Sequence, residues 1–509
     1  MDFNEVRLEK LSESALGVFY KGLTNNFYDL KNINLSEEEN IFALFLENLI
    51  QRKASFSELQ NFNVPENFLN DFRENIVSVI ELNGLLEKIP SKKIFISLLE
   101  SLIRLISKVN FVSDKALFSE IVLHNSIGLK QLSFFSLEKD FEELMINSLD
   151  EVFVFHKDFG FCKTNIVLDE KKFNNILQRI AQSVGKDFNK SNPLLDARLP
   201  DGSRVNATMD NVSAKGISLT IRKFSTIPLT IIDLIKDNIL SVESAAFLWL
   251  MVDGFGINPK NILVIGGTAS GKTTLLSILT NFIRLSERVI SIEDTLELSL
   301  LDRKNWVALE AKHSKDEEIN MDDLLKNALR MRPDRIIVGE VRGNEALTLF
   351  TAMDNGHAGC LGTIHANNAR ESINKLSERP FDVPKSHLAL IDLIVVMKKI
   401  YSKNKGVSRH VSQIAEVSKM DDKILLANVF ELNNSILSRT NLPSHIIEEF
   451  ALENSMEKND LKKEIETRQL VLSWMIENNI HKPKEVLEVI QSYYFDSEKV
   501  LSSIYESLK

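Results

Sequence analysis

Cysteine is scarce in this chain of 509 residues: Cys162 and Cys360 are the only two, and they lie far apart in the sequence. Two isolated cysteines match neither a zinc-ligand spacing nor a disulfide framework. The opening residues, Met-Asp-Phe-Asn-Glu, also lack the basic region and the apolar stretch of a secretory signal. We therefore expect a cytoplasmic protein.

Positive charge and long apolar runs are scarce too. The 61 lysines and arginines are outnumbered by 71 aspartates and glutamates, which leaves a formal net charge of -10. Because an overall positive field that would recruit nucleic acid or anionic lipid is absent, we expect no nucleic-acid partner. The apolar runs at 245–252 and 388–397 are too short or too interrupted to cross a bilayer. Any membrane contact is expected to be indirect, through membrane proteins.

The clearest motif lies between Asn261 and Thr274. The apolar run 262–265 predicts a buried strand, residues 266–273 match the phosphate-loop pattern G-x-x-x-x-G-K-[ST], and an apolar helix is expected next. Glycines in such a loop let successive N–H groups converge on phosphate oxygens. The residues expected to bind ATP are Gly266, Gly267, Thr268, Ala269, Ser270, Gly271, Lys272, Thr273 and Thr274. Lys272 would neutralise the β- and γ-phosphates, and the Thr273 hydroxyl would ligate Mg²⁺.

Patterning predicts two regions before this motif. Residues 1–130 are expected to be mostly helical, with a capping box formed by Ser36 and Glu39, and to serve as a docking domain. A small α+β domain with a linker is expected at 131–228, and the nucleotide domain with a helical C-terminal extension at 229–509. Within the α+β domain we expect helices at 138–146 and 170–184, and strands at 151–156, 163–168, 194–199, 203–208 and 217–224.

Two stretches of the α+β domain resemble a known family. The run 193–206 reads Pro-Leu-Leu-Asp-Ala-Arg-Leu-Pro-Asp-Gly-Ser-Arg-Val-Asn, and 219–224 reads Leu-Thr-Ile-Arg-Lys-Phe. Both resemble the secretion ATPase superfamily of type II secretion, type IV pili and archaella, especially its archaeal branch. The resemblance implies an α/β fold in which a PAS-like domain is hinged to a RecA-like P-loop ATPase domain. It also implies a homo-hexamer that works on a polytopic membrane platform protein.

Hydrolysis of ATP needs carboxylates near the phosphates. A predicted strand at 288–292 ends in Glu293, Asp294 and, three residues further on, Glu297. The carboxyl ends of parallel strands face the nucleotide crevice, so these acids are candidates. The segment resembles the family's Asp box, which implies that Glu297 is catalytic.

A further strand is expected at 333–338, followed by Gly339 and Glu340. An ordinary Walker B strand ends in aspartate, whereas the carboxylate here comes one position later. The family shows this atypical form, and the resemblance implies that Glu340 reaches Mg²⁺ through water.

Two histidines, His357 and His365, follow this strand. They resemble the family's His box, which implies that His365, and less surely His357, contacts the γ-phosphate. A purely structural role is the alternative for each. A zinc site made with Cys360 would lack an evident fourth ligand.

Charge on the γ-phosphoryl group must be balanced by arginine. Arg198, Arg204 and Arg222 in the α+β domain are candidates, as are Arg330 and Arg332 before the Walker B strand. Surface salt bridges are the alternative for all five, and the resemblance favours Arg204 and Arg222.

These features predict a hexameric ATPase that drives type IV pilus-like filament assembly or protein secretion, peripheral at the inner face of the cell membrane. An archaellum motor of the same superfamily, a RecA-like DNA motor and a non-hydrolysing nucleotide switch are the alternatives. After the ATPase motifs we expect an exposed basic hairpin with Lys403, Lys405, Arg409 and His410, and helices from Ser444 onward.

Overall fold

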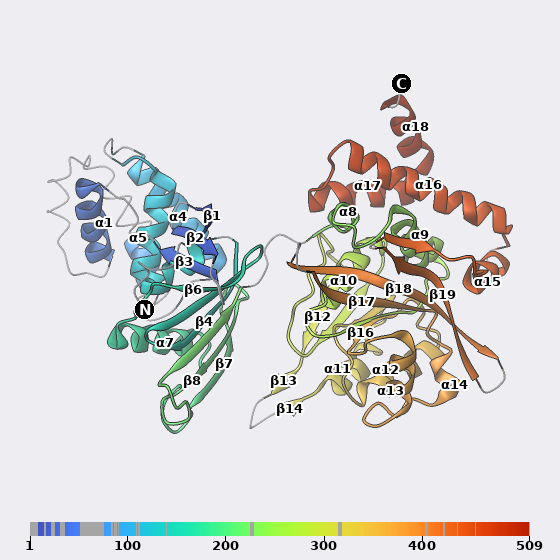
Figure 1. The fold of residues 1–509 in the computed structure, drawn as a ribbon, viewed down its shortest axis with the longest axis horizontal. Helices are drawn as coiled ribbons and strands as arrows, with labels where there is room; N and C mark the ends of the chain where they lie inside the picture. Colours follow the sequence, from blue (N-terminus) through green and yellow to red (C-terminus); the bar gives the residue numbers. More distant parts are fainter. Residues whose placement is uncertain are drawn as a thin grey trace. The chain divides into compact units, whose positions relative to one another are not determined.

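The computed structural model describes residues 9–507 apart from 15–16, 22–25, 31–35, 51–75, 83–84, 86–88, 90, 108, 110–111, 139, 224–228, 314–317, 403–405, 421–422, 435 and 454. The chain divides into two compact units, Met1–Thr226 and Ile227–Lys509, and each contains a nine-stranded sheet (Figure 1). Among the helices of the described residues, none combines the length and hydropathy needed to cross a membrane.

The sheet of the first unit has the strand order β1-β2-β3-β6-β5-β4-β9-β8-β7. Its strands are β1 Glu9–Glu13, β2 Gly17–Lys21, β3 Asn26–Leu30, β4 Phe141–Ser148, β5 Glu151–His156, β6 Gly160–Thr164, β7 Leu194–Arg198, β8 Arg204–Thr208 and β9 Ser218–Arg222. The helices are α1 Glu37–Ile50, α3 Ser78–Leu82, α4 Lys92–Ile106, α5 Lys115–Ile127, α6 Ser133–Leu137 and α7 Glu170–Ser183.

Strands β1–β3 occupy the first part of a region that the sequence predicts to be mostly helical. β2 buries Val18 and Phe19, and β3 buries Tyr28. Gly17 allows these strands a close approach, because a Cβ there would lie 2.5 Å from the Tyr28 ring. β3 also pairs in parallel with the distant β6. The helical prediction is therefore wrong for these three strands, since pairing with a remote strand is invisible to local patterning.

The helix predicted at 138–146 is also wrong, because this segment forms β4. A register shift between Phe141 and Glu143 lets Phe141 face the core together with Leu144, so their spacing imitates that of a helix. β4 pairs with β5 on one side and with β9 on the other. These ladders hold both edges of the segment in extended form.

Helices α1, α4 and α5 of the first unit pack together in one apolar core, to which they contribute Phe42, Leu102 and Val122 respectively. The predicted capping box is confirmed: Ser36 N–H donates to Glu39 Oε2 at 2.8 Å, and Glu39 N–H donates to Ser36 Oγ at 3.1 Å. At the start of α7, the Asp169 side chain accepts the N–H of Lys172 and so caps the helix. The end of the region 131–228, where the linker is expected, lies outside the described residues from 224 to 228.

The second unit has the strand order β12-β11-β15-β16-β10-β17-β18-β19-β20. Its strands are β10 Ile262–Gly266, β11 Val289–Glu293, β12 Trp306–Glu310, β15 Arg335–Val338, β16 Leu361–Ile364, β17 Leu393–Ser402, β18 Gly406–Met420, β19 Lys423–Asn433 and β20 Ile436–Arg439, beside a small ladder of β13 Lys312–His313 and β14 Glu318–Ile319. In this sheet order, the strands from β12 through β11, β15, β16 and β10 to β17 are parallel to their neighbours. The strands from β17 through β18 and β19 to β20 are antiparallel to theirs.

Helices cover both faces of this second sheet (Figure 1). They are α8 Ile231–Lys236, α9 Val242–Asp253, α10 Lys272–Leu279, α11 Met321–Ala328, α12 Glu345–Asp354, α13 Ala369–Ser377, α14 Lys385–Leu388, α15 His445–Glu453, α16 Lys458–Glu477, α17 Pro483–Phe495 and α18 Ser497–Ser507. Along β10, Ile262 and Val264 enter one apolar core while Leu263 and Ile265 enter the other. This two-sided burial explains the continuous apolar run.

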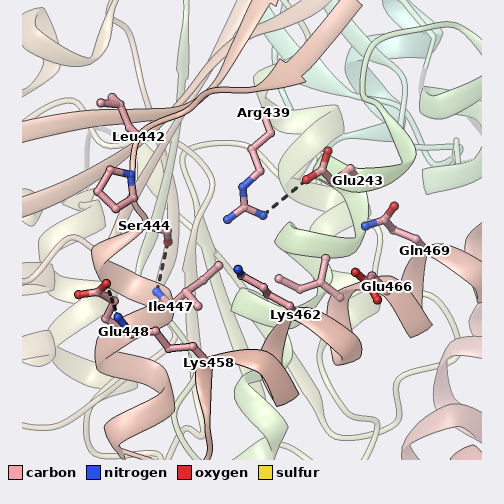
Figure 2. A pocket seen from close by; sticks show the side chains of 12 residues that line it. Glu243, Arg439, Leu442, Ser444, Ile447, Glu448, Lys458, Lys462, Glu466 and Gln469 are labelled. Atoms are coloured by element: carbon pink, nitrogen blue, oxygen red, sulfur yellow. Dashed lines mark hydrogen bonds and ion pairs between the residues drawn. The ribbon is translucent and has the colours of Figure 1, made fainter.

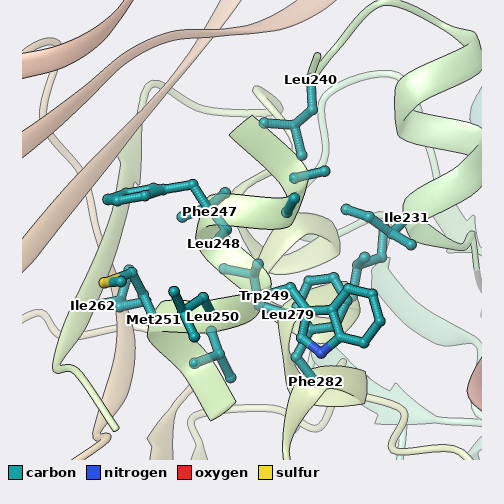
Figure 3. Packing of buried hydrophobic residues seen from close by; sticks show 14 of the residues in the cluster. Ile231, Leu240, Phe247, Leu248, Trp249, Leu250, Met251, Ile262, Leu279 and Phe282 are labelled. Atoms are coloured by element: carbon teal, nitrogen blue, oxygen red, sulfur yellow. The ribbon is translucent and has the colours of Figure 1, made fainter. Parts of the chain in front are cut away.

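The C-terminal helices are part of the second unit's core. Helix α16 packs on α9, whose Trp249 stacks on Phe282 in the interior (Figure 3). Buried Arg468 of α16 donates to Asp253 at 2.9 Å and lies 5.0 Å from the centre of a Trp249 ring. Since a buried charge needs a partner, this pair fixes the helical extension on the sheet-bearing part of the unit.

Candidate active site

The candidate site lies at the carboxyl edge of the parallel strands in the second unit. β10, β11, β15 and β16 end there, and the phosphate loop, Glu297, Glu340 and His365 follow them along the chain. Carboxyl ends of parallel strands share one edge of a sheet, so four separate sequence motifs meet at this edge.

The phosphate loop connects β10 to α10, which confirms the predicted strand, loop and helix. Gly271 has φ +93°, and Ala269 also has a positive φ, +57°. A Cβ on Gly266 would lie 2.5 Å from Ser270 Oγ and 2.6 Å from the Met397 carbonyl oxygen. The loop therefore has the close-packed, partly left-handed backbone that an anion-binding turn needs.

Lys272 is buried at the start of α10. Its Nζ donates to the Gly267 carbonyl at 3.0 Å and lies 3.3 Å from His365 Nδ1. Burial lowers the pKa of Lys272, while the nearby Glu340 and Glu297 oppose that shift. The ammonium group is thus held over the loop beside two carboxylates.

His365 joins Lys272 to the Walker B carboxylate. Its Nε2 lies 2.9 Å from Glu340 Oε1, while its Nδ1 faces Lys272. Burial lowers the pKa of His365, and the Lys272 charge lowers it further. A neutral ring can accept the Lys272 ammonium at Nδ1 and keep its N–H at Nε2, on the side of Glu340.

Glu340 is also held by Arg342, which the sequence does not single out. Arg342 Nη2 donates to Glu340 Oε2 at 2.6 Å, and its Nη1 lies 3.4 Å from Asp294 Oδ2. This guanidinium holds the carboxylates that follow β15 and β11 close together. Lys272, His365, Glu340 and Arg342 thus form a continuous polar row.

Glu293 and Glu297 have different environments. Glu293 is buried, and its Oε2 accepts the N–H groups of Glu297 at 2.6 Å and Leu298 at 2.9 Å. Glu297 itself is exposed at the site. A Cβ on Gly339 would lie 2.7 Å from Glu293 Cγ. The glycine at the end of β15 thus makes room for Glu293, and the Walker B carboxylate follows at Glu340.

The second histidine lies elsewhere. His357 precedes β16 and His365 follows it, so a strand of four residues separates them. Such a strand spans roughly 13 Å, which is too far for one shared metal ion. Cys360 is buried and its thiol donates to the His357 carbonyl at 3.2 Å. This arrangement rules out the zinc site considered for these three residues.

The arginines predicted in the α+β region gather at one end of three strands. Arg198 of β7 lies directly opposite Arg204 of β8, which in turn lies opposite Arg222 of β9. Directly paired residues of antiparallel strands share one face, so the three form a row. They belong to the first unit, whereas the phosphate loop belongs to the second.

Arg330 and Arg332 are exposed in the turn between α11 and β15. That turn lies at the amino end of β15, and Glu340 lies beyond its carboxyl end. The two arginines therefore lie at the opposite end of β15 from the edge of the sheet that carries the phosphate loop of their own chain.

The predicted basic hairpin is formed by β17 and β18, although Lys403 and Lys405 lie outside the described residues. Arg409 on β18 reaches the phosphate loop, where its Nε donates to the Ala269 carbonyl at 3.1 Å. His410 contacts the Asn238 carbonyl at 3.1 Å. The sequence indicates a cationic hairpin but not its place beside the loop, because that depends on the pairing of β17 with β10.

A hollow of about 540 Å³ lies elsewhere in the same unit, between β20, α15 and α16 (Figure 2). Its lining contains three cations and three carboxylates: Arg439, Lys458, Lys462, Glu243, Glu448 and Glu466. Arg439 lies 3.5 Å from Glu243, and Lys458 donates to Glu448 at 2.5 Å. This balanced charge gives no preference for phosphate.

A phosphate loop on a parallel sheet, with carboxylates on the neighbouring strands, defines an α/β ATPase fold. Residues 136–424 match the family described as "Type II/IV secretion system protein". The match covers more than half of the 509 residues, so the chain belongs to this family of secretion ATPases.

Similar proteins support this membership. Uncharacterized protein MJ0900 of Methanocaldococcus jannaschii is 33% identical over 394 residues, which are 75% of this chain and 70% of that protein. Uncharacterized protein MJ0781 of the same organism is 51% identical over 226 residues, and the chain spans only 31% of its length. The type IV secretion system protein VirB11 of Bartonella henselae is 29% identical over 322 residues, which are 54% of this chain and 90% of VirB11.

Proposed function

We propose that this chain hydrolyses ATP with Mg²⁺ and that hydrolysis drives protein secretion or the assembly of a type IV pilus-like filament. The observation that carries the proposal is the polar row Lys272, His365, Glu340 and Arg342 beside the phosphate loop. A mere nucleotide switch would not require a histidine held between the loop lysine and the Walker B carboxylate. The name of the relative VirB11 favours a secretion machine.

The residues present fit ATP and Mg²⁺. The packed backbone at Gly266 leaves no room for a side chain, as a loop that wraps a phosphate requires. Lys272 and the first N–H groups of α10 would receive the phosphates, together with the rest of the loop 266–274. The Thr273 hydroxyl and, through water, Glu340 would hold Mg²⁺, which when bound neutralises phosphate charge.

We assign to Glu297 the role of activating the water that attacks the γ-phosphate. Glu297 is exposed on a loop that is anchored by Glu293. A carboxylate there can orient the water and take its proton. His365 is suited to register the γ-phosphate. When phosphate oxygens engage the Lys272 ammonium, His365 Nδ1 loses its donor, and the ring can turn so that its Nε2–H leaves Glu340 and donates to the phosphate.

We propose that arginines from two places bring further positive charge to the phosphates. Arg204 and Arg222 would approach the phosphates when the first unit, which we regard as containing a PAS-like domain, closes over the nucleotide of the same chain. Arg330 or Arg332, which lie at the opposite end of β15 from the edge that carries their own loop, would enter the site of a neighbouring subunit. Such head-to-tail contacts close into a ring, and we propose a homo-hexamer.

We propose that residues 1–130 dock on a polytopic membrane platform protein, that residues 131–228 form the α+β domain with its linker, and that 229–509 form the motor. The protein would work at the inner face of the cell membrane. An archaellum motor would use the same site, and only the platform partner would differ.

Steady-state ATP hydrolysis by the full chain, with and without membranes containing the platform, tests this function. We expect Mg²⁺-dependent turnover in the wild type, and its loss together with tight ATP binding in Lys272→Ala. Wild-type protein that binds ATP but never turns it over would support a switch instead. Strong, salt-sensitive stimulation by DNA would support a DNA motor.

A further inference from the structure

The hairpin of β17 and β18 forms one wall of the phosphate loop. β17 pairs in parallel with β10, so that Met397 lies opposite Gly266. A Cβ on Gly271 would lie 3.3 Å from Met397 Cε and 3.5 Å from Arg409 Cδ. The loop therefore rests against one side chain from each strand of the hairpin.

Arg409 makes a directed contact with the loop. Its Nε donates to the Ala269 carbonyl at 3.1 Å. Ala269 has φ +57°, a left-handed conformation that an alanine adopts only under strain. A carbonyl oxygen turned toward a phosphate would repel it, so a donor that holds this oxygen on the hairpin side favours the phosphate-binding form of the loop.

The backbone of Arg409 is itself well anchored. The next two residues of β18 are tied to the segment after α8: His410 Nδ1 lies 3.1 Å from the Asn238 carbonyl, and Val411 N–H donates to the Ile239 carbonyl at 3.1 Å. The guanidinium is thus presented by a fixed strand, and little of its contact energy is lost in ordering the chain.

We propose that Arg409 is a positioning residue of the nucleotide site, which holds Ala269 in the left-handed conformation so that the following N–H groups face the phosphates. This inference rests on the proposed ATP site. Because Arg409 acts through a loop that holds the α- and β-phosphates, it should assist ADP and ATP equally. A residue that acts on the γ-phosphate would instead mainly affect turnover.

The test measures binding of ADP and of ATP to the full chain by titration, and turnover at saturating ATP. We expect Arg409→Ala to raise both dissociation constants by roughly tenfold, as the loss of a charge-assisted hydrogen bond predicts, and to lower kcat by less than about twofold. Lys419→Ala removes an exposed cation from the same strand and should change neither quantity.

A second variant tests the left-handed conformation itself. Glycine adopts positive φ without strain, so Ala269→Gly should restore at least about half of the lost affinity when it is combined with Arg409→Ala. Unchanged ADP affinity in Arg409→Ala, with or without a lower kcat, would overturn the proposal, and so would failure of the glycine to restore any affinity. Wild-type protein that binds neither nucleotide would instead refute the ATP site on which the inference rests.

Discussion

Gly339, at the end of β15, leaves the space that the Glu293 side chain occupies, and Glu293 in turn accepts the N–H groups of Glu297 and Leu298. The lack of a side chain at Gly339 thus determines the positions of the Glu293 and Glu297 carboxylates. The glycine explains why the Walker B acid is displaced by one position, to Glu340. It also links that strand to the loop that carries the proposed water-orienting residue.

Gly339→Ala should therefore impair catalysis more than binding. The new Cβ would lie 2.7 Å from Glu293 Cγ, so Glu293 must move and Glu297 loses its anchor. We expect kcat to fall about tenfold or more, with ADP affinity nearly unchanged. Turnover and ADP titration would be compared with Gly362→Ala, whose Cβ meets Leu263 at an ordinary 3.4 Å. Equal turnover in the two variants would contradict this explanation.

Single residues differ in how far the sequence reveals them. Lys272 is found from the motif alone, because the loop, its strand and its helix are contiguous. Arg342 and Arg409 are not, since their partners Asp294 and Ala269 are brought near only by strand order. The contact of His365 with Lys272 likewise joins residues that are 93 positions apart in the sequence.

At the scale of elements, β10, β11 and β15 are predictable because parallel strands buried on both faces are continuously apolar. β4 is not, since its register shift at Phe141 gives a spacing that resembles a helix. β1–β3 are short and gain their stability from pairing, including the contact of β3 with the remote β6. Sequence patterning reports local periodicity and misses such non-local pairing.

Two neighbouring strands are tied together by Asp392. This residue precedes β17, and its Oδ2 accepts the N–H of Asn261, just before β10, at 2.6 Å. Burial raises the pKa of Asp392 from 3.8 to about 6, although Lys260 opposes the shift. The pKa of Asp392 is higher in the folded state than in the unfolded state, so protonation of this carboxyl group stabilises the fold. That stabilisation is complete below about pH 4 and is lost as the pH rises through about 6.

Asp392→Asn keeps a neutral acceptor and should remove this pH dependence. We expect the free energy of unfolding of the wild type to fall by at most about 3 kcal/mol more than that of the variant between pH 4 and pH 7. This value is an upper limit, because 22% of the Asp392 side-chain surface remains accessible to solvent, which screens its charge. Denaturant unfolding at several pH values measures the difference, and parallel curves for the two proteins would refute the assignment.

At the scale of the whole molecule, the proposed motor needs charge from outside the phosphate loop. Arg204 and Arg222 stand in a row in the first unit, and Arg330 lies at the opposite end of β15 from the edge that carries the loop of its own chain. In a ring, the two groups of arginines would therefore act on different nucleotide sites. The first pair would act within one chain, whereas Arg330 would act between subunits.

Mixed rings separate these cases. In an equal mixture of Lys272→Ala and Arg330→Ala subunits, about a quarter of the sites would combine an intact loop with an intact neighbouring arginine, so about a quarter of wild-type turnover should return. A mixture of Lys272→Ala with Arg204→Ala should recover none. Recovery in the second mixture would place Arg204 between subunits, and a protein that stays monomeric with ATP would rule out the ring.

In the proposed mechanism, Glu297 activates water beside a loop that binds ATP independently of it. The most direct test is to measure ATP affinity and turnover together in Glu297→Gln. We predict an ATP dissociation constant within about threefold of wild type and a kcat lower by about 100-fold or more, because the amide cannot accept the water's proton. Turnover close to that of the wild type would contradict the claim and would move the water-activating role to another carboxylate.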